Sequence, residues 1–356
     1  MLFDNAADTK DDWDQLKAGY TYGLYGTPTT MELAARIAEF EGGAYTYVTA
    51  GGQGAISLVN LALLKAGDHV LIPANIYGPH RKLAYSVLKR FGVEIDFYDP
   101  LIGAGISQSL KSNTKLVWCE SPGSLTMEVQ DVAAIVKASH AGGALVAIDN
   151  TWAAGVFFRP FEYSIDVNVQ AVTKYIGGHS DLLLGAVTVK DRSLYEQIGY
   201  THQLIGCSAS PDDCSLALRG FKTLGVRLRQ IEASALEIAR WLAGRPEIER
   251  VLHPALESCP GHEFWKRDFT GSAGLFSIVF RPGPTKQQVR AFVDALELFE
   301  IGYSWGGVAS LAVAYDMSNA KGRPEYGHRI VRLYVGLEET GELIADLERA
   351  MKQLVS

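Results

Sequence analysis

The chain of 356 residues has few cysteines, no long apolar run and no excess of positive charge. The longest apolar stretch, Leu182–Val189, is far too short to cross a bilayer. The formal net charge of −7 argues against general nucleic-acid binding and against docking on an anionic membrane surface. The four cysteines include no CxxC pair and are too sparse for a secreted disulfide scaffold, so we expect free thiols in a reducing compartment. These cysteines are Cys119, Cys207, Cys214 and Cys259.

Metal-binding and export signals are also missing. The eight histidines show no HExxH or other tight ligand spacing, so we expect no metal centre. The opening segment MLFDNAADTKDDWDQ is acidic and has neither the basic nor the apolar part of a signal peptide. These features predict a cytoplasmic protein.

Short apolar runs alternate with helical patterns over most of the first 221 residues. We expect strands over 44–49, 70–74, 93–98, 116–119, 144–149, 167–173 and 182–189. We expect helices between them over 31–41, 55–65, 81–90 and 132–140. Repeated β-α units with apolar strands predict an α/β fold, with a mainly parallel sheet covered by helices on both faces. Ligands of such sheets bind at the carboxyl ends of the strands.

The pattern changes after about residue 220. A long helix is expected over 224–242, followed by strands over 276–280 and 330–335 and helices over 287–296 and 341–354. This mixture is typical of a smaller α+β domain. We therefore predict an N-terminal arm (1–26), a large ligand-binding domain (27–221) and a C-terminal small domain (222–356).

A glycine cluster, Gly51-Gly52-Gln53-Gly54, lies between a predicted strand and a predicted helix. Glycines allow close approach of a ligand to the backbone, and a helix N-terminus offers free N–H groups, so this segment suits a phosphate. It is neither a GxGxxG nor a P-loop motif. Taken alone, a tight turn between strand and helix explains it equally simply.

Two charged residues follow apolar strands at the predicted ligand edge. Asp149 ends the strand 144–149, where a buried acid needs a cationic or hydrogen-bonding partner, although a turn or cap residue is as good an explanation. Lys174 follows the run 167–173, where desolvation would make its amine nucleophilic. The alternative is an ordinary solvated lysine, but the glycines that follow favour a functional role.

Two more residues complete a possible site. Tyr77 lies in the loop after the strand 70–74, where its ring can stack on a planar ligand or simply pack on the surface. Arg332 lies within an apolar strand and needs an anion, either a substrate carboxylate or a structural acid. A reactive lysine, an acid, an aromatic ring, an amide-lined anion site and a carboxylate-binding cation together suit pyridoxal 5′-phosphate (PLP) and an amino-acid substrate.

The sequence resembles the PLP-dependent enzymes of cysteine and methionine metabolism, most closely the cystathionine β-lyases. The resemblance runs from about Tyr22 to the C-terminus and rests on several long segments. They are ESPGSLTMEVQD (120–131), AIDNTWAAGVFFRP (147–160), TKYIGGHSD (173–181), GHEFWKRDFTGSAGLFS (261–277), YSWGG (303–307) and RLYVGLE (332–338). The resemblance implies PLP fold type I, aspartate-aminotransferase-like, with a mainly parallel seven-stranded sheet and a smaller C-terminal α+β domain.

The resemblance also implies roles for the candidate residues. Lys174 would bind PLP covalently and move the Cα proton, Asp149 would keep the pyridine nitrogen protonated, and Tyr77 would stack on the ring. The phosphate would be bound by the backbone amides of Gly52 and Gln53 and by the hydroxyl of Thr173. The substrate carboxylate would be bound by Arg332, with Ser304 and Trp305 nearby. Tyr22 would reach into the phosphate site of a neighbouring subunit, which implies a homotetramer built as a dimer of dimers.

Four positions depart from the pattern of this family. Leu24 and Tyr25 stand where an arginine is usual, Ala171 replaces a serine, and Ala309 replaces a glutamate. The loss of a charged phosphate contact predicts looser PLP binding unless another cation substitutes, because charge-assisted hydrogen bonds contribute about 1.5–3 kcal/mol each.

The activity that the resemblance implies is β-elimination of the C–S bond of L-cystathionine, giving homocysteine, pyruvate and ammonia. Another C–S lyase, a γ-elimination or a γ-replacement on the same scaffold stays open because of Ala309. Racemisation of alanine is possible as a side activity. A weakly active PLP-binding homologue is a further alternative.

Overall fold

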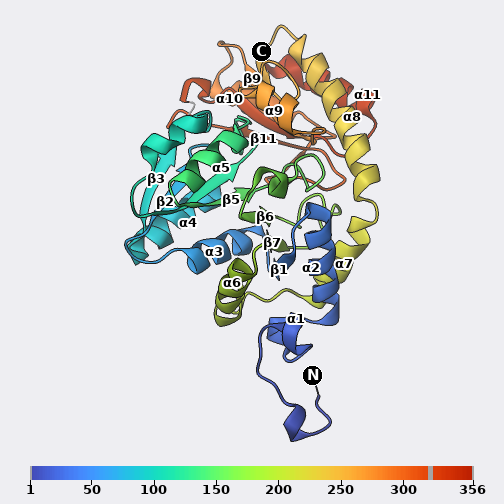
Figure 1. Cartoon of the computed structure of the whole chain (residues 1–356). Helices are drawn as coiled ribbons and strands as arrows, with labels where there is room; N and C mark the ends of the chain where they lie inside the picture. Colours follow the sequence, from blue (N-terminus) through green and yellow to red (C-terminus); the bar gives the residue numbers. More distant parts are fainter. Residues whose placement is uncertain (1, 320–323, 355–356) are drawn as a thin grey trace.

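The computed structural model describes residues 2–319 and 324–354, which form two sheets with their covering helices (Figure 1). The larger sheet has seven strands in the order β1-β7-β6-β5-β4-β2-β3. Its strands are β1 (Tyr45–Thr49), β2 (His69–Pro73), β3 (Glu94–Tyr98), β4 (Thr114–Glu120), β5 (Leu145–Asp149), β6 (Val167–Gln170) and β7 (Gly185–Val189). The predicted α/β fold with a mainly parallel seven-stranded sheet is confirmed.

The pairing of strands explains where the ligand edge lies. Strands β3, β2, β4, β5 and β6 run parallel, whereas β7 is antiparallel to both β6 and β1. Every residue of β2, β6 and β7 is buried, as expected of strands covered on both faces. In the register, Glu120 at the end of β4 pairs with Asp149 at the end of β5, which pairs with Val169 on β6. The carboxyl ends of these strands therefore form one edge.

Helices cover both faces of the larger sheet. They are α2 (Pro28–Glu41), α3 (Gly52–Leu63), α4 (Gly78–Leu83), α5 (Val132–Ala141), α6 (Arg192–Leu204) and α7 (Pro211–Phe221). One apolar cluster joins α2 and α5 to one face of the sheet, and another joins α3 to the opposite face. Helix α2 begins where the Thr27 side chain accepts a hydrogen bond from the Thr30 backbone and ends at Gly42, whose φ of 75° favours glycine.

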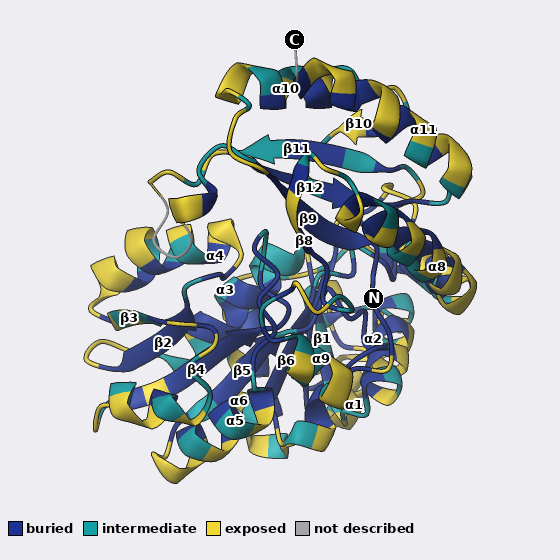
Figure 2. Ribbon diagram, turned by 90° about the horizontal axis from the view of Figure 1, so that it is seen from above, coloured by how far each residue is buried: buried dark blue, intermediate teal, exposed yellow. Residues whose placement is uncertain are grey.

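The smaller sheet has five strands in the order β10-β11-β12-β9-β8. They are β8 (Ile248–Leu252), β9 (Leu275–Phe280), β10 (Glu300–Ile301), β11 (Leu311–Tyr315) and β12 (Ile330–Tyr334). The helices of this half are α8 (Leu224–Ala243), α9 (His262–Asp268), α10 (Lys286–Asp294) and α11 (Thr340–Met351). In Figure 2, α10 and α11 lie on the outer side of this sheet, whose opposite side faces the larger half. The division at residues 221 and 222 stays a prediction.

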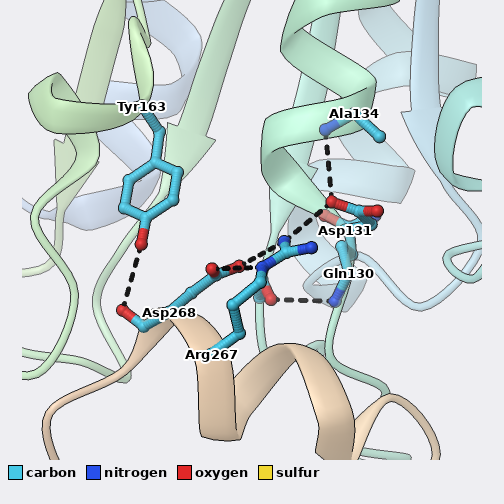
Figure 3. Close-up of polar contacts among 7 residues, drawn as sticks. Gln130, Asp131, Ala134, Tyr163, Arg267 and Asp268 are labelled. Carbon is cyan, nitrogen blue, oxygen red and sulfur yellow. Dashed lines mark hydrogen bonds and ion pairs between the residues drawn. The ribbon is translucent and has the colours of Figure 1, made fainter.

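Hydrogen bonds and an ion-pair cluster join the two halves near the ligand edge. The Trp152 indole N–H donates to the Leu275 carbonyl at 2.9 Å, and the Gly274 N–H donates to the Tyr175 hydroxyl at 2.9 Å. Figure 3 shows a second connection, in which the Arg267 guanidinium of α9 contacts Asp131, the N-cap of α5, at 2.8 Å. The same guanidinium binds its neighbour Asp268. These contacts hold the smaller sheet against the loops that follow β5 and β6.

The N-terminal arm contains α1 (Gln15–Ala18) and extends away from the body of the molecule (Figure 1). Short 3-10 segments occur at Ala6–Asp8, Gly23–Tyr25, Lys89–Phe91, Gly103–Ser109, Pro160–Tyr163, Pro324–Tyr326 and Lys352–Leu354. A π-helical turn, Ala84–Leu88, continues α4. Within residues 2–319 and 324–354, no helix combines the length and apolarity that a membrane span requires.

Candidate active site

Lys174 lies in the turn that follows β6, at the carboxyl edge of the larger sheet. Its Nζ donates to the Ser304 hydroxyl at 2.8 Å and lies 5.2 Å from the centre of the Trp305 ring. Burial lowers the pKa of Lys174 to about 8, with the positive charge of Arg332 adding to the fall and Asp149 opposing it. The structure therefore brings the predicted lysine, serine and tryptophan together, with an amine that loses its proton more readily than usual.

A glycine explains why the loop of residues 303–307 can lie on the lysine turn. Gly306 has a φ of 86°, which favours glycine, and a Cβ at this position would lie 2.8 Å from Lys174 Cα. Any other residue would push the loop away from the lysine. The packing thus requires the glycine at position 306, and the same SWGG segment supplies Ser304 and Trp305.

Asp149 ends β5 and is held by Thr151 two residues later. The Thr151 N–H and hydroxyl both donate to Asp149 Oδ1, at 3.0 and 2.6 Å. The Thr151 hydroxyl oxygen also accepts the Ala171 N–H at 2.9 Å, which connects the acid to the turn that carries Lys174. Burial raises the pKa of Asp149, although the Thr151 hydrogen bonds and the Lys174 charge counteract the rise. In the described part of the chain these bonds occupy only Oδ1, so Oδ2 is available to a ligand.

Tyr77 immediately precedes α4, in the loop that follows β2. Its side chain is 41% exposed, so the ring has a free surface. Burial of the hydroxyl raises the pKa of Tyr77, and the charges of Asp149 and Glu120 add to the rise. The structure thus places Tyr77 within electrostatic reach of both Asp149 and Arg332, as expected of a residue that stacks on a ligand at this edge.

The glycine cluster forms the turn from β1 into α3. Gly51 has a φ of 141°, and Gly52 and Gln53 are the first two residues of the helix, whose N–H groups have no partner within the helix. A Cβ on Gly52 would lie 2.7 Å from the Ala171 Cβ, so only glycine fits here. The Gln53 Oε1 atom is buried and, among the described residues, has no hydrogen-bond partner. Free amides and this unpaired oxygen indicate that the turn is built around a polar ligand.

Thr173 lies beside the turn but uses its hydroxyl within the protein. The hydroxyl donates to the Leu184 carbonyl at 3.0 Å and accepts the Leu184 N–H at 3.0 Å. A phosphate contact would require this hydroxyl to change its donor direction. The role assigned to Thr173 stays a prediction.

Arg332 is largely buried on β12 and faces the same edge. Its Nη2 donates to the Tyr303 carbonyl at 2.5 Å, and the guanidinium carbon lies 5.5 Å from the centre of the Tyr315 ring. Within the described residues no carboxylate pairs with this guanidinium, and burial lowers the pKa of Arg332. A buried cation without an acidic partner is suited to bind an anionic ligand.

Tyr22 is not brought to this site within one chain. Its side chain is 61% exposed on the arm, and its ring makes an edge contact with Tyr25 at 5.8 Å. The Tyr25 hydroxyl donates to Asp11 at 2.8 Å. The role of Tyr22 between subunits stays a prediction.

The substitutions at the expected phosphate site are also untested. Ala171 packs against the glycine turn. Weaker phosphate binding as a result of Leu24 and Ala171 stays a prediction.

Sequence reasoning missed Thr151, Glu120 and Tyr315. The spacing Asp149-Asn-Thr151 is the signal that an aspartate and a threonine can share a turn. Glu120 ends β4 as Asp149 ends β5, and this matching position was the available signal. Tyr315 could not be found from the sequence because its contact with Arg332 depends on the antiparallel pairing of β11 and β12.

The residues present fit PLP. The free backbone amides of Gly52 and Gln53 suit its phosphate, the free Oδ2 of Asp149 suits a protonated ring nitrogen, and the Lys174 amine suits its aldehyde. The exposed ring face of Tyr77 suits a planar heterocycle. Each of these groups suits a different part of the same cofactor.

Comparisons with known proteins agree with this fit. The family model "Cys/Met metabolism PLP-dependent enzyme" matches residues 2–352. The chain is 46% identical over 334 residues to a "Putative cystathionine beta-lyase" of Rhizobium johnstonii, covering 93% of this chain and 84% of that protein. It is 43% identical over 341 residues to "Cystathionine beta-lyase MetC" of Escherichia coli, covering 94% and 86%.

A solved structure agrees as well. The cystathionine gamma synthase of Xanthomonas oryzae pv. oryzae in complex with cystathionine has a TM-score of 0.89 and 32% identity, covering 95% of this chain and 89% of that chain. The fold, the geometry of the site and the sequence all indicate the same family. The chain therefore belongs to the Cys/Met metabolism PLP-dependent enzyme family.

Proposed function

We propose that this chain is a PLP-dependent carbon–sulfur lyase that converts L-cystathionine and water into homocysteine, pyruvate and ammonia. The observation that carries the proposal is the Lys174 amine, which lies between Ser304 and Trp305 and has a pKa of about 8. Near neutral pH, a larger fraction of a lysine with a lowered pKa is neutral, and only the neutral amine can attack an aldehyde or accept a proton from a carbon acid. An acid, Asp149, and a cation, Arg332, are close enough for their charges to act on this amine.

The cofactor would be held by residues from several elements. Lys174 would bind it covalently, Asp149 would face its ring nitrogen, Tyr77 would lie on its ring, and the Gly52 and Gln53 amides would bind its phosphate. When bound, PLP withdraws electron density from the α-carbon of an amino acid and so makes the Cα–H bond acidic. Asp149 supports this by keeping a negative charge next to the ring nitrogen.

The chain's own residues would then orient the substrate and move its protons. Arg332 binds the α-carboxylate, because it is a buried cation without an acidic partner among the described residues. Ser304 accepts a hydrogen bond from Lys174 Nζ and so aims the amine toward the edge where the substrate lies. Lys174 removes the Cα proton, and Lys174 or Tyr77 donates a proton to the departing homocysteine sulfur as the C–S bond breaks.

We also propose a cytoplasmic homotetramer in which Tyr22 completes the phosphate site of a neighbouring copy. The exposed ring of Tyr22 on an extended arm supports a role in another copy of the chain. All four cysteines are free, which agrees with a reducing compartment. Analytical ultracentrifugation tests the assembly directly.

The products formed from L-cystathionine test the activity. Purified protein saturated with PLP is expected to release pyruvate and homocysteine in equal amounts, and Lys174→Ala is expected to release neither. Release of 2-oxobutyrate and cysteine would instead assign γ-elimination. That alternative has some support, because Ala309 replaces a glutamate beside the site and a cystathionine gamma synthase shares the fold. Wild-type protein that binds PLP but forms no product would contradict the proposed activity.

A further inference from the structure

Glu120 is a second buried carboxyl at the carboxyl edge of the larger sheet. It ends β4 directly beside Asp149, its register partner on the parallel strand β5. Only 7% of its surface is exposed. The proposed reaction assigns no role to Glu120. Burying a carboxyl group costs free energy unless hydrogen bonds or an opposite charge compensate.

Both carboxylate oxygens of Glu120 accept hydrogen bonds from loop backbones. Oε2 accepts the Tyr77 N–H at 2.8 Å, and Oε1 accepts the Ser124 N–H at 2.8 Å. The two loops follow different strands, β2 and β4, so one side chain ties them together. The backbone of Glu120 is fixed in turn, because its own N–H donates to Gln130 Oε1 at 3.0 Å.

Tyr77 depends on this anchor because little else fixes it. Its side chain is 41% exposed, and no other aromatic ring in the described residues contacts its ring. On the other side, the Tyr77 carbonyl accepts only the Arg81 N–H of the first turn of α4, at 3.2 Å. The position of the tyrosine relative to the sheet edge is therefore set by its backbone, and chiefly by the bond to Glu120.

The charges near Glu120 agree with a role toward a cationic ligand. No Lys, Arg or His of the described residues forms an ion pair with it, and burial together with the Asp149 charge raises the pKa of Glu120. Two carboxyls side by side repel each other unless a positive group lies between or beside them. A protonated pyridine ring bound at Asp149 is such a group.

We propose that Glu120 is a positioning residue for the cofactor, which holds the Tyr77 loop and the Ser124 loop in the places that fix the ring at Asp149. The proposal rests on the proposed binding of PLP at this edge. A carboxylate can accept both N–H groups at once, whereas an amide offers one acceptor oxygen and turns an NH₂ group against the second N–H. Glu120→Gln therefore keeps the size of the side chain but releases one loop.

The test uses the holoenzyme and two signals of the bound cofactor. We expect Glu120→Gln to weaken PLP binding on the order of tenfold, as the loss of one charge-assisted hydrogen bond would. The circular dichroism of the cofactor in the visible region should also fall, because that signal requires one fixed ring orientation. A merely structural role would lower the melting temperature and leave the dichroism per bound cofactor unchanged.

Asp346→Asn is the matched control. Asp346 is also a buried carboxylate that accepts backbone N–H groups, those of Glu297, Leu298 and Phe299, but it lies on α11 in the smaller half. The Asp346→Asn variant should be less stable than the wild type and should keep the wild-type PLP affinity and dichroism. If Glu120→Gln does not fold, Glu120→Asp keeps the charge, shortens its reach by one methylene and should show the same loss of dichroism.

The outcomes separate this proposal from the one on which it rests. Wild-type dichroism and PLP affinity in a folded Glu120 variant would overturn the positioning role and leave the proposed function standing. Wild-type protein that gains no visible band with PLP would overturn both. Loss of dichroism in the Glu120 variants but not in Asp346→Asn supports the positioning role.

Discussion

The lowered pKa of Lys174 predicts that its amine is reactive near neutral pH even before a cofactor binds. Burial lowers this pKa from the usual 10.5 to about 8. At pH 7.5, about a quarter of molecules with such a pKa carry a neutral amine, against about one in a thousand for the usual value. The expected gain in neutral amine is therefore on the order of two hundredfold.

Pulse labelling of the PLP-free protein with dinitrofluorobenzene measures this directly. Only neutral amines react, and mass spectrometry of the Lys174 peptide gives the extent of labelling at each pH between 6 and 10.5. Lys65, whose side chain is 80% exposed, serves as an internal reference. We expect Lys174 labelling to rise to a plateau with a midpoint near pH 8. Lys174 labelling that still rises above pH 9.5 without reaching a plateau would refute the burial argument.

Two variants test the physical causes separately. Arg332→Leu removes a like charge and should move the Lys174 midpoint to higher pH, whereas Asp149→Asn removes an opposite charge and should move it to lower pH. A midpoint that does not move in either variant would show that the three groups are farther apart than described.

Three further predictions concern stability and substrate binding. Burial raises the pKa of Glu41 to about 7, so its stabilising contribution is complete below about pH 4.5 and is lost as the pH rises through 7. In urea unfolding, the free energy of unfolding of the wild type should fall by about 3 kcal/mol over that pH range relative to that of Glu41→Gln. The same pH dependence of the free energy of unfolding in both proteins would contradict this. Asp131→Ala should cost about 1–2 kcal/mol, because it removes the cap of α5 and the pair with Arg267, whereas Asp131→Asn should retain the cap and most of the stability. Tyr315→Leu should raise the KM of the amino-acid substrate about threefold or more with little change in kcat, because its ring supports Arg332, and an unchanged KM would refute that support.

Much of the larger half could be predicted from the sequence, because buried parallel strands appear as short apolar runs. The strand that carries the site was predicted to be too long, since 167–173 reads as one run although β6 ends at Gln170. The reason is a tertiary contact: the Ala171 N–H donates to the Thr151 hydroxyl and not to a neighbouring strand. The helix predicted over 81–90 is divided among α4, a π-helical turn and a 3-10 turn.

The residues that carry reactive groups were easier to predict than those that hold them. Asp149 ends one apolar run and Lys174 follows another, and the parallel pairing of β5 with β6 brings the ends of these two strands to the same edge. Glu120 accepts the Tyr77 N–H and Thr151 accepts the Ala171 N–H, and these hydrogen bonds to loop backbones exist only in the folded chain. The helices α6 and α7 were also missed, because neither lies between two predicted strands of the alternating series.

The covalent attachment of the cofactor to Lys174 is the claim on which the proposed function depends. Borohydride reduction of the purified protein after addition of PLP, followed by proteolysis and mass spectrometry, identifies the lysine that carries it. We predict one modified peptide, containing residues 173–181, with the mass of a phosphopyridoxyl group on Lys174. A modification on any other lysine, or none on a folded protein saturated with PLP, would contradict the account.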